Sequence, residues 1–379
     1  MMRYSCFKML ALAAMLPALF SGCIKVDIQD RGEEPAPPAF VSLADVARLL
    51  ASVPLEAEHL QEVHGAALSS AGNGYDEEYR MKDLFAAPGT GVGDIPTKSF
   101  RHPLRDALRE AFYSTKSSGG EWLDSLALSD VQIYWPGSAD WDGKSLPVIT
   151  YDPGDGAERN EGYALQADGS VKKVMVDEQM SLERPVWVVN RNSDAEYKSL
   201  EMRRREDPAW GTGGDILVKA DTELKTLVLR SFKARRQYDS WFAGASEFFV
   251  KMGSVENFVA STEAELRLYE PSITDFMIVV RRKQVGKEVP FNAVLVSEWT
   301  PKLESCALMI IEDDGGTRNT WKCSAVVKVE SKSYGFELEL PLYSRDDIVW
   351  RGSLTRRYIE KYSGTPVRLG DVELVLELI

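Results

Sequence analysis

The sequence predicts an α+β protein of several domains, with a small helical N-terminal region, a β-rich middle and a C-terminal antiparallel β-sandwich. Three patterns indicate this fold class. Apolar residues recur at helical spacing within residues 41–118, short β-branched and aromatic runs separated by turn residues fill residues 119–215, and apolar and polar residues alternate within residues 222–379. We therefore expect three domains with these boundaries.

The first residues have the pattern of a bacterial export signal. The basic residues Arg3 and Lys8 precede the apolar run 9–20, which is too short to span a bilayer. Small residues then lead to Cys23, an arrangement that resembles the lipobox at which lipoprotein signal peptidase cuts. The resemblance implies that the signal peptide, residues 1–22, is removed and that lipid such as palmitate is attached to Cys23. The alternative is an ordinary secretory signal with an incidental cysteine.

The stretch after the cut, residues 23–40, predicts a tether. It contains Glu33, Glu34 and a proline-rich run at 35–38, and it offers little apolar surface to bury. We expect lipid on Cys23 to hold the folded body at the outer membrane. The sequence leaves open whether that body faces the periplasm or the cell surface.

Composition excludes some classes of partner. Removing residues 1–22 lowers Lys+Arg from 45 to 43 against 58 Asp+Glu, which changes the net charge from −13 to −15. Such an acidic chain is disfavoured as a nucleic-acid-binding protein. No segment after the signal peptide is long and apolar enough to predict a membrane-spanning helix.

Four helices are expected in residues 41–118. Ser42 with Asp45 three residues later predicts a helix start, and Leu43, Val46 and Leu50 then fall on one face. Further helices are predicted at 55–68, 76–85 and 102–113, the last with Pro103 in its first turn.

A small antiparallel sheet is expected next. Its strands are predicted at 131–135, 146–151, 162–165, 171–176 and 185–189, with a hairpin turn at 167–169. Residues 198–214, which include three consecutive arginines and several glycines, predict an exposed connection to the last domain.

About eight strands are expected in the C-terminal domain. Apolar residues alternate with Glu337 and Glu339 in one strand, and with Glu373 and Glu377 in another, which is the two-residue period of half-buried strands. The predicted strands cover 226–232, 248–252, 275–280, 293–297, 305–311, 322–329, 334–340 and 372–378, with a short helix at 354–362.

Two cysteines remain after Cys6 is removed with the signal peptide and Cys23 is lipidated. Cys306 and Cys323 lie on two strands predicted to form a hairpin, and the midpoint between them falls in the turn at 313–316. A symmetric hairpin would place them opposite each other, so a cross-strand disulfide is one expectation. Two buried free thiols are the other.

Two segments of the C-terminal domain resemble a known pattern. Residues 238–247 run Tyr-Asp-Ser-Trp-Phe-Ala-Gly-Ala-Ser-Glu between two strands, and residues 310–316 run Ile-Ile-Glu-Asp-Asp-Gly-Gly. They are similar to the first and third calcium loops of the calcium- and lipid-binding sandwich domains of protein kinase C and synaptotagmin. The resemblance implies a calcium site made of Asp239, Glu247, Asp313 and Asp314. The alternative is that these acidic turns are merely solvated.

The whole layout resembles lipoproteins of Bacteroidota, which have a helical start and a sandwich end. This resemblance is one of general layout rather than of a defined motif; the helical part includes Gly-Tyr-Asp-Glu-Glu-Tyr at 74–79. It implies no activity.

Catalytic patterns are scarce, whereas one recognition pattern is present. The only histidines, His59, His64 and His102, fall in the helical part, and no nucleophile elbow or phosphate-binding loop occurs. In the middle domain, Trp135 and Trp141 flank a loop that bears Asp140 and Asp142. Aromatic faces with neighbouring carboxylates predict a glycan-binding surface, and the alternative is that these aromatic residues form core.

We therefore expect a non-enzymatic, membrane-anchored lipoprotein that binds a glycan or protein partner and contains a calcium site in its sandwich. The alternative is a secreted hydrolase, active on glycans or another substrate. Such an enzyme would use carboxylates that spacing does not single out among 58 acidic residues.

Overall fold

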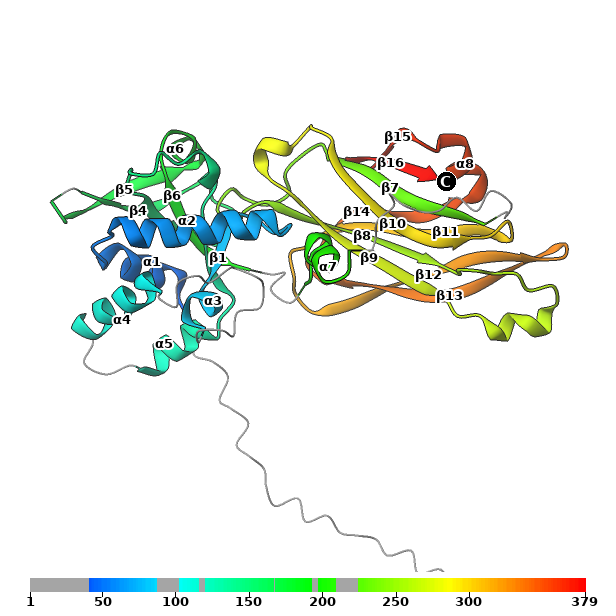
Figure 1. The fold of residues 1–379 in the computed structure, drawn as a ribbon, viewed down its shortest axis with the longest axis horizontal. Coiled ribbons are helices and arrows are strands. Elements are labelled where there is room, and N and C mark those ends of the chain that lie inside the picture. The colour runs from blue at the N-terminus through cyan, green and yellow to red at the C-terminus, as the bar shows by residue number, and fades with distance from the viewer. Residues whose placement is uncertain (1–40, 87–101, 116–119, 167, 193–196, 209–223) are drawn as a thin grey trace, which may run out of the picture. The chain divides into compact units, whose positions relative to one another are not determined.

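The computed structural model describes residues 41–86, 102–115, 120–166, 168–192, 197–208 and 224–379. The predicted signal peptide, Cys23 and the tether lie outside these ranges. The fold is α+β, with 28% helix and 42% strand, which confirms the predicted class (Figure 1). No helix in the described ranges has both the length and the apolar character that crossing a bilayer requires.

Five helices begin the described chain. They are α1 (Leu43–Ser52), α2 (Ala57–Gly72), α3 (Met81–Phe85), α4 (Pro103–Thr115) and α5 (Gly120–Ala127). The Ser42 side chain caps α1 by accepting a hydrogen bond from the backbone N–H of Asp45, as its sequence indicated. The predicted helix at 76–85 is only partly correct, because residues 78–80 join a sheet and only the last five residues are helical.

Six strands form the first sheet. They are β1 (Glu78–Arg80), β2 (Val131–Tyr134), β3 (Val148–Tyr151), β4 (Arg159–Leu165), β5 (Val171–Asp177) and β6 (Val186–Arg191), in the order β1-β2-β6-β3-β4-β5. All five strands predicted from the sequence are present. The sheet is mixed rather than antiparallel, since β3 and β6 run parallel. The chain makes this parallel crossover through the β4–β5 hairpin and the short helix α6 (Glu178–Glu183).

The helices and this sheet share one hydrophobic core. Leu50 and Val63 of the helices are buried together with Ile133, Ile149 and Trp187 of the strands. We refer to residues 41–192 as the N-terminal region. The predicted connection at 198–214 contains a helix, α7 (Leu200–Glu206), whose Leu200 is buried in the core of the C-terminal part, so it is not merely an exposed link.

Two sheets form the C-terminal β-sandwich, residues 224–379. Their strands are β7 (Lys225–Ala234), β8 (Ser246–Ser254), β9 (Ser272–Val280), β10 (Val289–Trp299), β11 (Leu303–Glu312), β12 (Arg318–Val329), β13 (Lys332–Tyr343), β14 (Asp347–Thr355), β15 (Thr365–Leu369) and β16 (Val372–Leu378). One sheet has the order β10-β7-β16-β15, and the other has the order β13-β12-β11-β8-β9 with β14 also paired to β11. The eight predicted strands are present, whereas β14 and β15 were not anticipated. The predicted short helix is α8 (Arg356–Tyr362).

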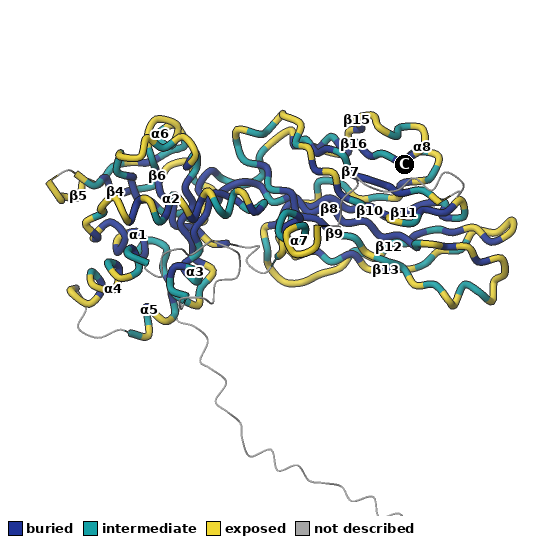
Figure 2. Tube along the Cα trace, viewed as in Figure 1, coloured by how far each residue is buried: buried dark blue, intermediate teal, exposed yellow. Residues whose placement is uncertain are grey.

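The alternating strands bury one face each. On β16 the apolar residues Val372 to Leu378 are buried at every second position, and both sheets contribute to a single core. Figure 2 shows buried stretches along the sandwich strands and exposed residues mainly at the turns. The alternation of apolar and polar residues in the sequence predicted these strands because the buried side of a half-buried strand recurs every two residues.

The loop that connects β7 to β8 packs into the N-terminal region. Its Trp241 and Phe242 are buried in a small core with Val148, Val176 and Val186. The indole N–H of Trp241 donates a hydrogen bond to the backbone carbonyl of Glu158 at 3.1 Å. This loop therefore belongs to the sandwich in sequence and to the N-terminal core in packing.

Cys306 and Cys323 are free thiols in the structure, not the disulfide that was one of the two expectations. The reason is strand pairing. β12 pairs with β11 only at Leu303 and Ser305, so Cys306 lies opposite Leu354 of β14 and Cys323 lies opposite Leu338 of β13. Burial raises the pKa of both thiols, which lowers their reactivity.

Candidate functional site

The candidate site lies where β8 begins and β11 ends. Glu312, the last residue of β11, is paired with Phe248 of β8, and the N–H of Asp313 donates to the carbonyl of Glu247 at 3.1 Å. This register places the side chains of Glu247 and Glu312 on neighbouring strand ends. Antiparallel pairing therefore brings together two carboxylates that are 65 positions apart in the chain.

Asp239 approaches from the β7–β8 loop. The backbone N–H groups of Tyr238 and Asp239 donate to the Ser246 hydroxyl at 2.9 and 3.4 Å. The Arg282 guanidinium donates to the carbonyl of Asp239 at 2.7 Å. These bonds fix the loop backbone so that the Asp239 carboxylate points toward the strand ends.

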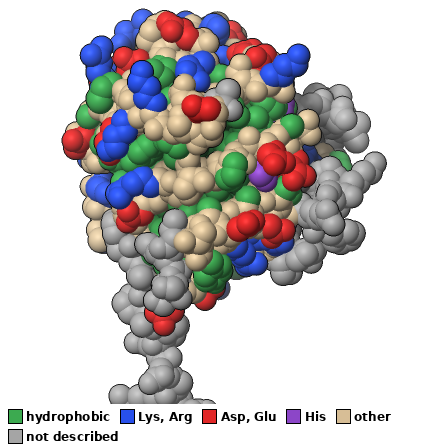
Figure 3. Space-filling model, turned by 90° about the vertical axis from the view of Figure 1, so that its left-hand side faces the viewer, with side chains coloured by type: hydrophobic (Ala, Val, Ile, Leu, Met, Phe, Trp, Pro, Cys, Tyr) green, Lys and Arg blue, Asp and Glu red, His purple; other side chains and the backbone are tan. Residues whose placement is uncertain are grey.

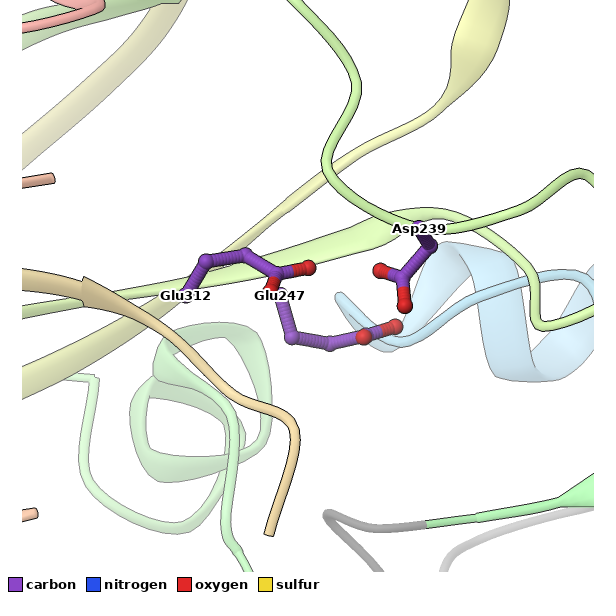
Figure 4. A group of neighbouring side chains, drawn as sticks. All are labelled: Asp239, Glu247 and Glu312. Atoms are coloured by element: carbon purple, nitrogen blue, oxygen red, sulfur yellow. The ribbon is translucent and has the colours of Figure 1, made fainter. Parts of the chain in front are cut away.

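The three carboxylates converge. Asp239, Glu247 and Glu312 each offer an oxygen, and these oxygens all lie within 4.8 Å of one another (Figure 4). A cluster of this kind could hold a metal ion. The side chains come from a loop and two strands, so the fold rather than a single contiguous motif builds the site.

Burial makes this cluster costly without a counter-charge. Glu312 is 0% exposed, and neither of its carboxylate oxygens has a hydrogen-bond partner within the described structure; the same is true of Asp239 Oδ2. Burial raises the pKa of Glu312, and the neighbouring Asp239 and Asp314 charges raise it further. Burial also raises the pKa of Asp239. The negative charge of the cluster therefore has to be neutralised, either by protonation of a carboxylate or by a cation nearby.

A cavity of about 480 Å³ opens above the cluster. Six carboxylates line it against two guanidinium groups: Asp76, Asp152, Asp239, Glu247, Asp313 and Asp314, with Arg191 and Arg345. Glu312 is not among the lining residues. By contrast, the face shown in Figure 3 has basic and acidic side chains interspersed.

The structure brings together two of the four predicted calcium ligands, Asp239 and Glu247, and places the other two, Asp313 and Asp314, in the wall of the same cavity. The third member of the cluster is Glu312, which the sequence analysis missed. Its signal was present, because Glu312 directly ends the apolar run 306–311. A carboxylate at the end of a buried strand is unusual enough to attract attention.

The four predicted glycan-binding residues also meet. Trp135, Asp140, Trp141 and Asp142 line a second cavity of about 180 Å³. Trp135 is buried in the core of the N-terminal region and packs edge-on against Trp141, with ring centroids 5.3 Å apart.

Their hydrogen bonds are internal. The Trp141 indole donates to the carbonyl of Ser145, and Asp142 accepts bonds from Lys144 and Ser145, which lower its pKa to about 2. Core packing and turn formation thus account for most of this pattern, which favours the alternative that these aromatic residues form core.

The chain matches no known protein-family model, no curated protein and no solved structure. Its function has to be inferred from the chemistry of its own residues.

Asp314 provides a pH test of the acidic cavity. Burial and the Asp239, Asp347 and Asp346 charges raise its pKa from 3.8 to about 6. A raised folded-state pKa means that the contribution of Asp314 to stability is present below pH 3.8 and is lost as pH rises through about 6. In EDTA we expect Asp314→Asn to be more stable than the wild type at pH 7.5, by roughly 1 kcal/mol after allowing for solvent screening, and equal to it at pH 4.

Urea denaturation at the two pH values measures this difference. Asp155→Asn, an exposed residue outside the cavity lining, is the matched control and should show little pH-dependent gain. A gain for Asp314→Asn that is equal at both pH values would contradict the raised pKa.

Proposed function

We propose that this protein is a membrane-anchored binding protein that holds a calcium ion at Asp239, Glu247 and Glu312. One observation carries the proposal: Glu312 is fully buried, its two oxygens have no hydrogen-bond partner in the described structure, and it points at two further carboxylates. A buried acid with partnerless oxygens is costly to keep ionised. A cation coordinated by all three groups removes that cost.

The donor set favours calcium over other metals. All three groups are hard oxygen donors, and Asp313 and Asp314 in the cavity wall offer more of the same kind. Calcium takes six to eight oxygen ligands in flexible geometry. Zinc prefers histidine and cysteine, and the three histidines all lie in the N-terminal region, away from the cluster. The loop resemblance noted in the sequence points to the same ion.

The anchor in this proposal is lipid on Cys23. The signal-like start, the small residues before Cys23 and the proline-rich tether support export and attachment to the outer membrane. The bound partner is a glycan or a protein, since a net charge of −15 after removal of residues 1–22, which carry two of the 45 basic residues, disfavours nucleic acid.

A hydrolase is the second candidate. The half-buried Asp239 and the buried Glu312 are carboxyl groups with raised pKa values next to a cavity, which is how an acid catalyst is often made. However, Glu312 has no exposed surface and does not line the cavity, so it cannot reach a substrate oxygen in this arrangement. The geometry therefore supports cation binding better than acid–base catalysis.

Calcium binding is tested by calorimetry and thermal melting of the full chain in detergent at pH 7.5. We expect heat on calcium addition and a higher melting temperature, because calcium at a hundredfold excess over its Kd stabilises the folded state by about 2.7 kcal/mol. Glu312→Gln should lose the calcium heat while keeping its melting temperature in EDTA, since glutamine resembles the protonated acid in size. The matched control is Glu337→Gln on the exposed face of β13, which should bind calcium normally. Absence of heat and of a melting shift at millimolar calcium would refute the site.

The anchor is tested separately in bacterial cells. We expect labelled palmitate to enter the wild-type chain but not Cys23→Ala, because Cys23 is the proposed site of acylation. Cys323→Ala is the control for cysteine loss and should take up the label as the wild type does. Label in Cys23→Ala equal to that in the wild type would disprove lipid anchoring at Cys23.

A further inference from the structure

The loop that carries Asp239 is held by the N-terminal region. Trp241 and Phe242, the second and third residues after Asp239, enter the small core formed with strands β3, β5 and β6. The Asn190 side-chain amide donates to the carbonyls of Phe242 and Ala243 at 3.0 and 2.5 Å. Movement of Asp239 is therefore coupled to packing in the N-terminal region.

The same loop is fixed a second time just before the next ligand. The backbone N–H of Ala245 donates to Asp76 Oδ2 at 2.9 Å, and Asp76 is buried near Arg281, with which it forms an ion pair at 3.7 Å. Glu247 follows two residues later. Between Asp239 and Glu247, the chain thus contacts the N-terminal region through the buried Trp241 and Phe242 side chains and through hydrogen bonds with Glu158, Asn190 and Asp76.

The N-terminal region also offers oxygens to the cavity. Asp152, which follows β3, lines the cavity together with Asp239, and its charge raises the pKa of Asp239. Asn192, which follows β6, lines the cavity as well; it is buried, and its Oδ1 has no hydrogen-bond partner in the described structure. Both residues present acceptors, which is what a cation rather than an anion requires.

We infer that Asp152 completes the cation site from the N-terminal region, so that a bound calcium ion latches the β7–β8 loop and ties the sandwich to the first sheet. This inference rests on the proposed calcium site. It extends that site from a cluster within the sandwich to one that also includes a residue of the N-terminal region. Without the ion, the carboxylates of Asp152 and Asp239 repel each other across the cavity; with it, both are attracted to one charge.

Hydrogen–deuterium exchange of the full chain in detergent tests the latch without any substitution. We expect calcium to slow exchange about tenfold or more in peptides covering residues 235–247 and residues 148–158, since both sides of the joint become ordered. Peptides from the β12–β13 turn, residues 326–336, are the internal control and should not change. Slower exchange confined to the sandwich would overturn the latch.

A matched pair of variants then tests Asp152 itself. Asp152→Asn should weaken calcium binding at least about tenfold, the loss typical even of a residue that only supports a metal ligand, and should abolish the protection of residues 148–158. Asp155→Asn, in the same loop but exposed and outside the cavity lining, should behave as the wild type.

The outcomes separate the two proposals. If the wild type binds calcium in calorimetry but neither Asp152→Asn nor the exchange of residues 148–158 responds, the latch is wrong and the calcium site stands. If the wild type shows no calcium heat, the proposed function fails and the latch fails with it. Should Asp152→Asn not fold, the exchange result on the wild-type chain decides the inference.

Discussion

The convergence of three carboxylates at one end of the sandwich, with Glu312 fully buried, is the constraint on which the proposed chemistry of this protein depends. Glu312 is sealed behind the cavity, and Asp239 and Glu247 close over it from a loop and from β8. In a low-dielectric setting, each charge raises the free energy of the next, so the folded chain has to neutralise the group with protons or with a metal ion. The fold accepts this cost where the β7–β8 loop packs into the core of the N-terminal region.

The two ways of neutralising the cluster correspond to two states. With protons, Glu312 stays neutral and can donate a hydrogen bond to Asp239, and the cavity retains a partial charge. With a cation, all three carboxylates are ionised and the ion replaces the protons. In this proposal, cation binding is coupled to loss of those protons. A calcium-binding protein anchored at a membrane surface would thereby respond to both the ion and the acidity of its compartment.

Part of this arrangement was accessible from the sequence. The alternation of β13 and β16 and the capped start of α1 at Ser42 are local signals, and the structure confirms them. Asp239 and Glu247 were named because residues 238–247 resemble the first calcium loop of calcium- and lipid-binding sandwich domains. Glu312 was missed because it follows a buried run and is adjacent to Asp313 and Asp314, which look like the turn itself. Its role depends on the β8–β11 register, and a single sequence does not contain that register.

Contacts between residues far apart in the sequence could not be predicted either, because they depend on how the strands and loops pack. Nothing in the local pattern shows that Trp241 and Phe242 leave the sandwich, or that Asp152 shares a cavity with Asp239. The disulfide, one of the two alternatives for Cys306 and Cys323, had a related basis: a turn between two strands suggested a symmetric hairpin, whereas β11 pairs along its length with β8 and β14.

The most direct test of the central claim is anomalous X-ray diffraction from crystals grown with calcium. The account predicts a calcium peak among Asp239, Glu247 and Glu312, with carboxylate oxygens at about 2.3–2.6 Å from the ion. A map with no anomalous peak there at millimolar calcium, and with Glu312 hydrogen-bonded to Asp239 instead, would contradict it.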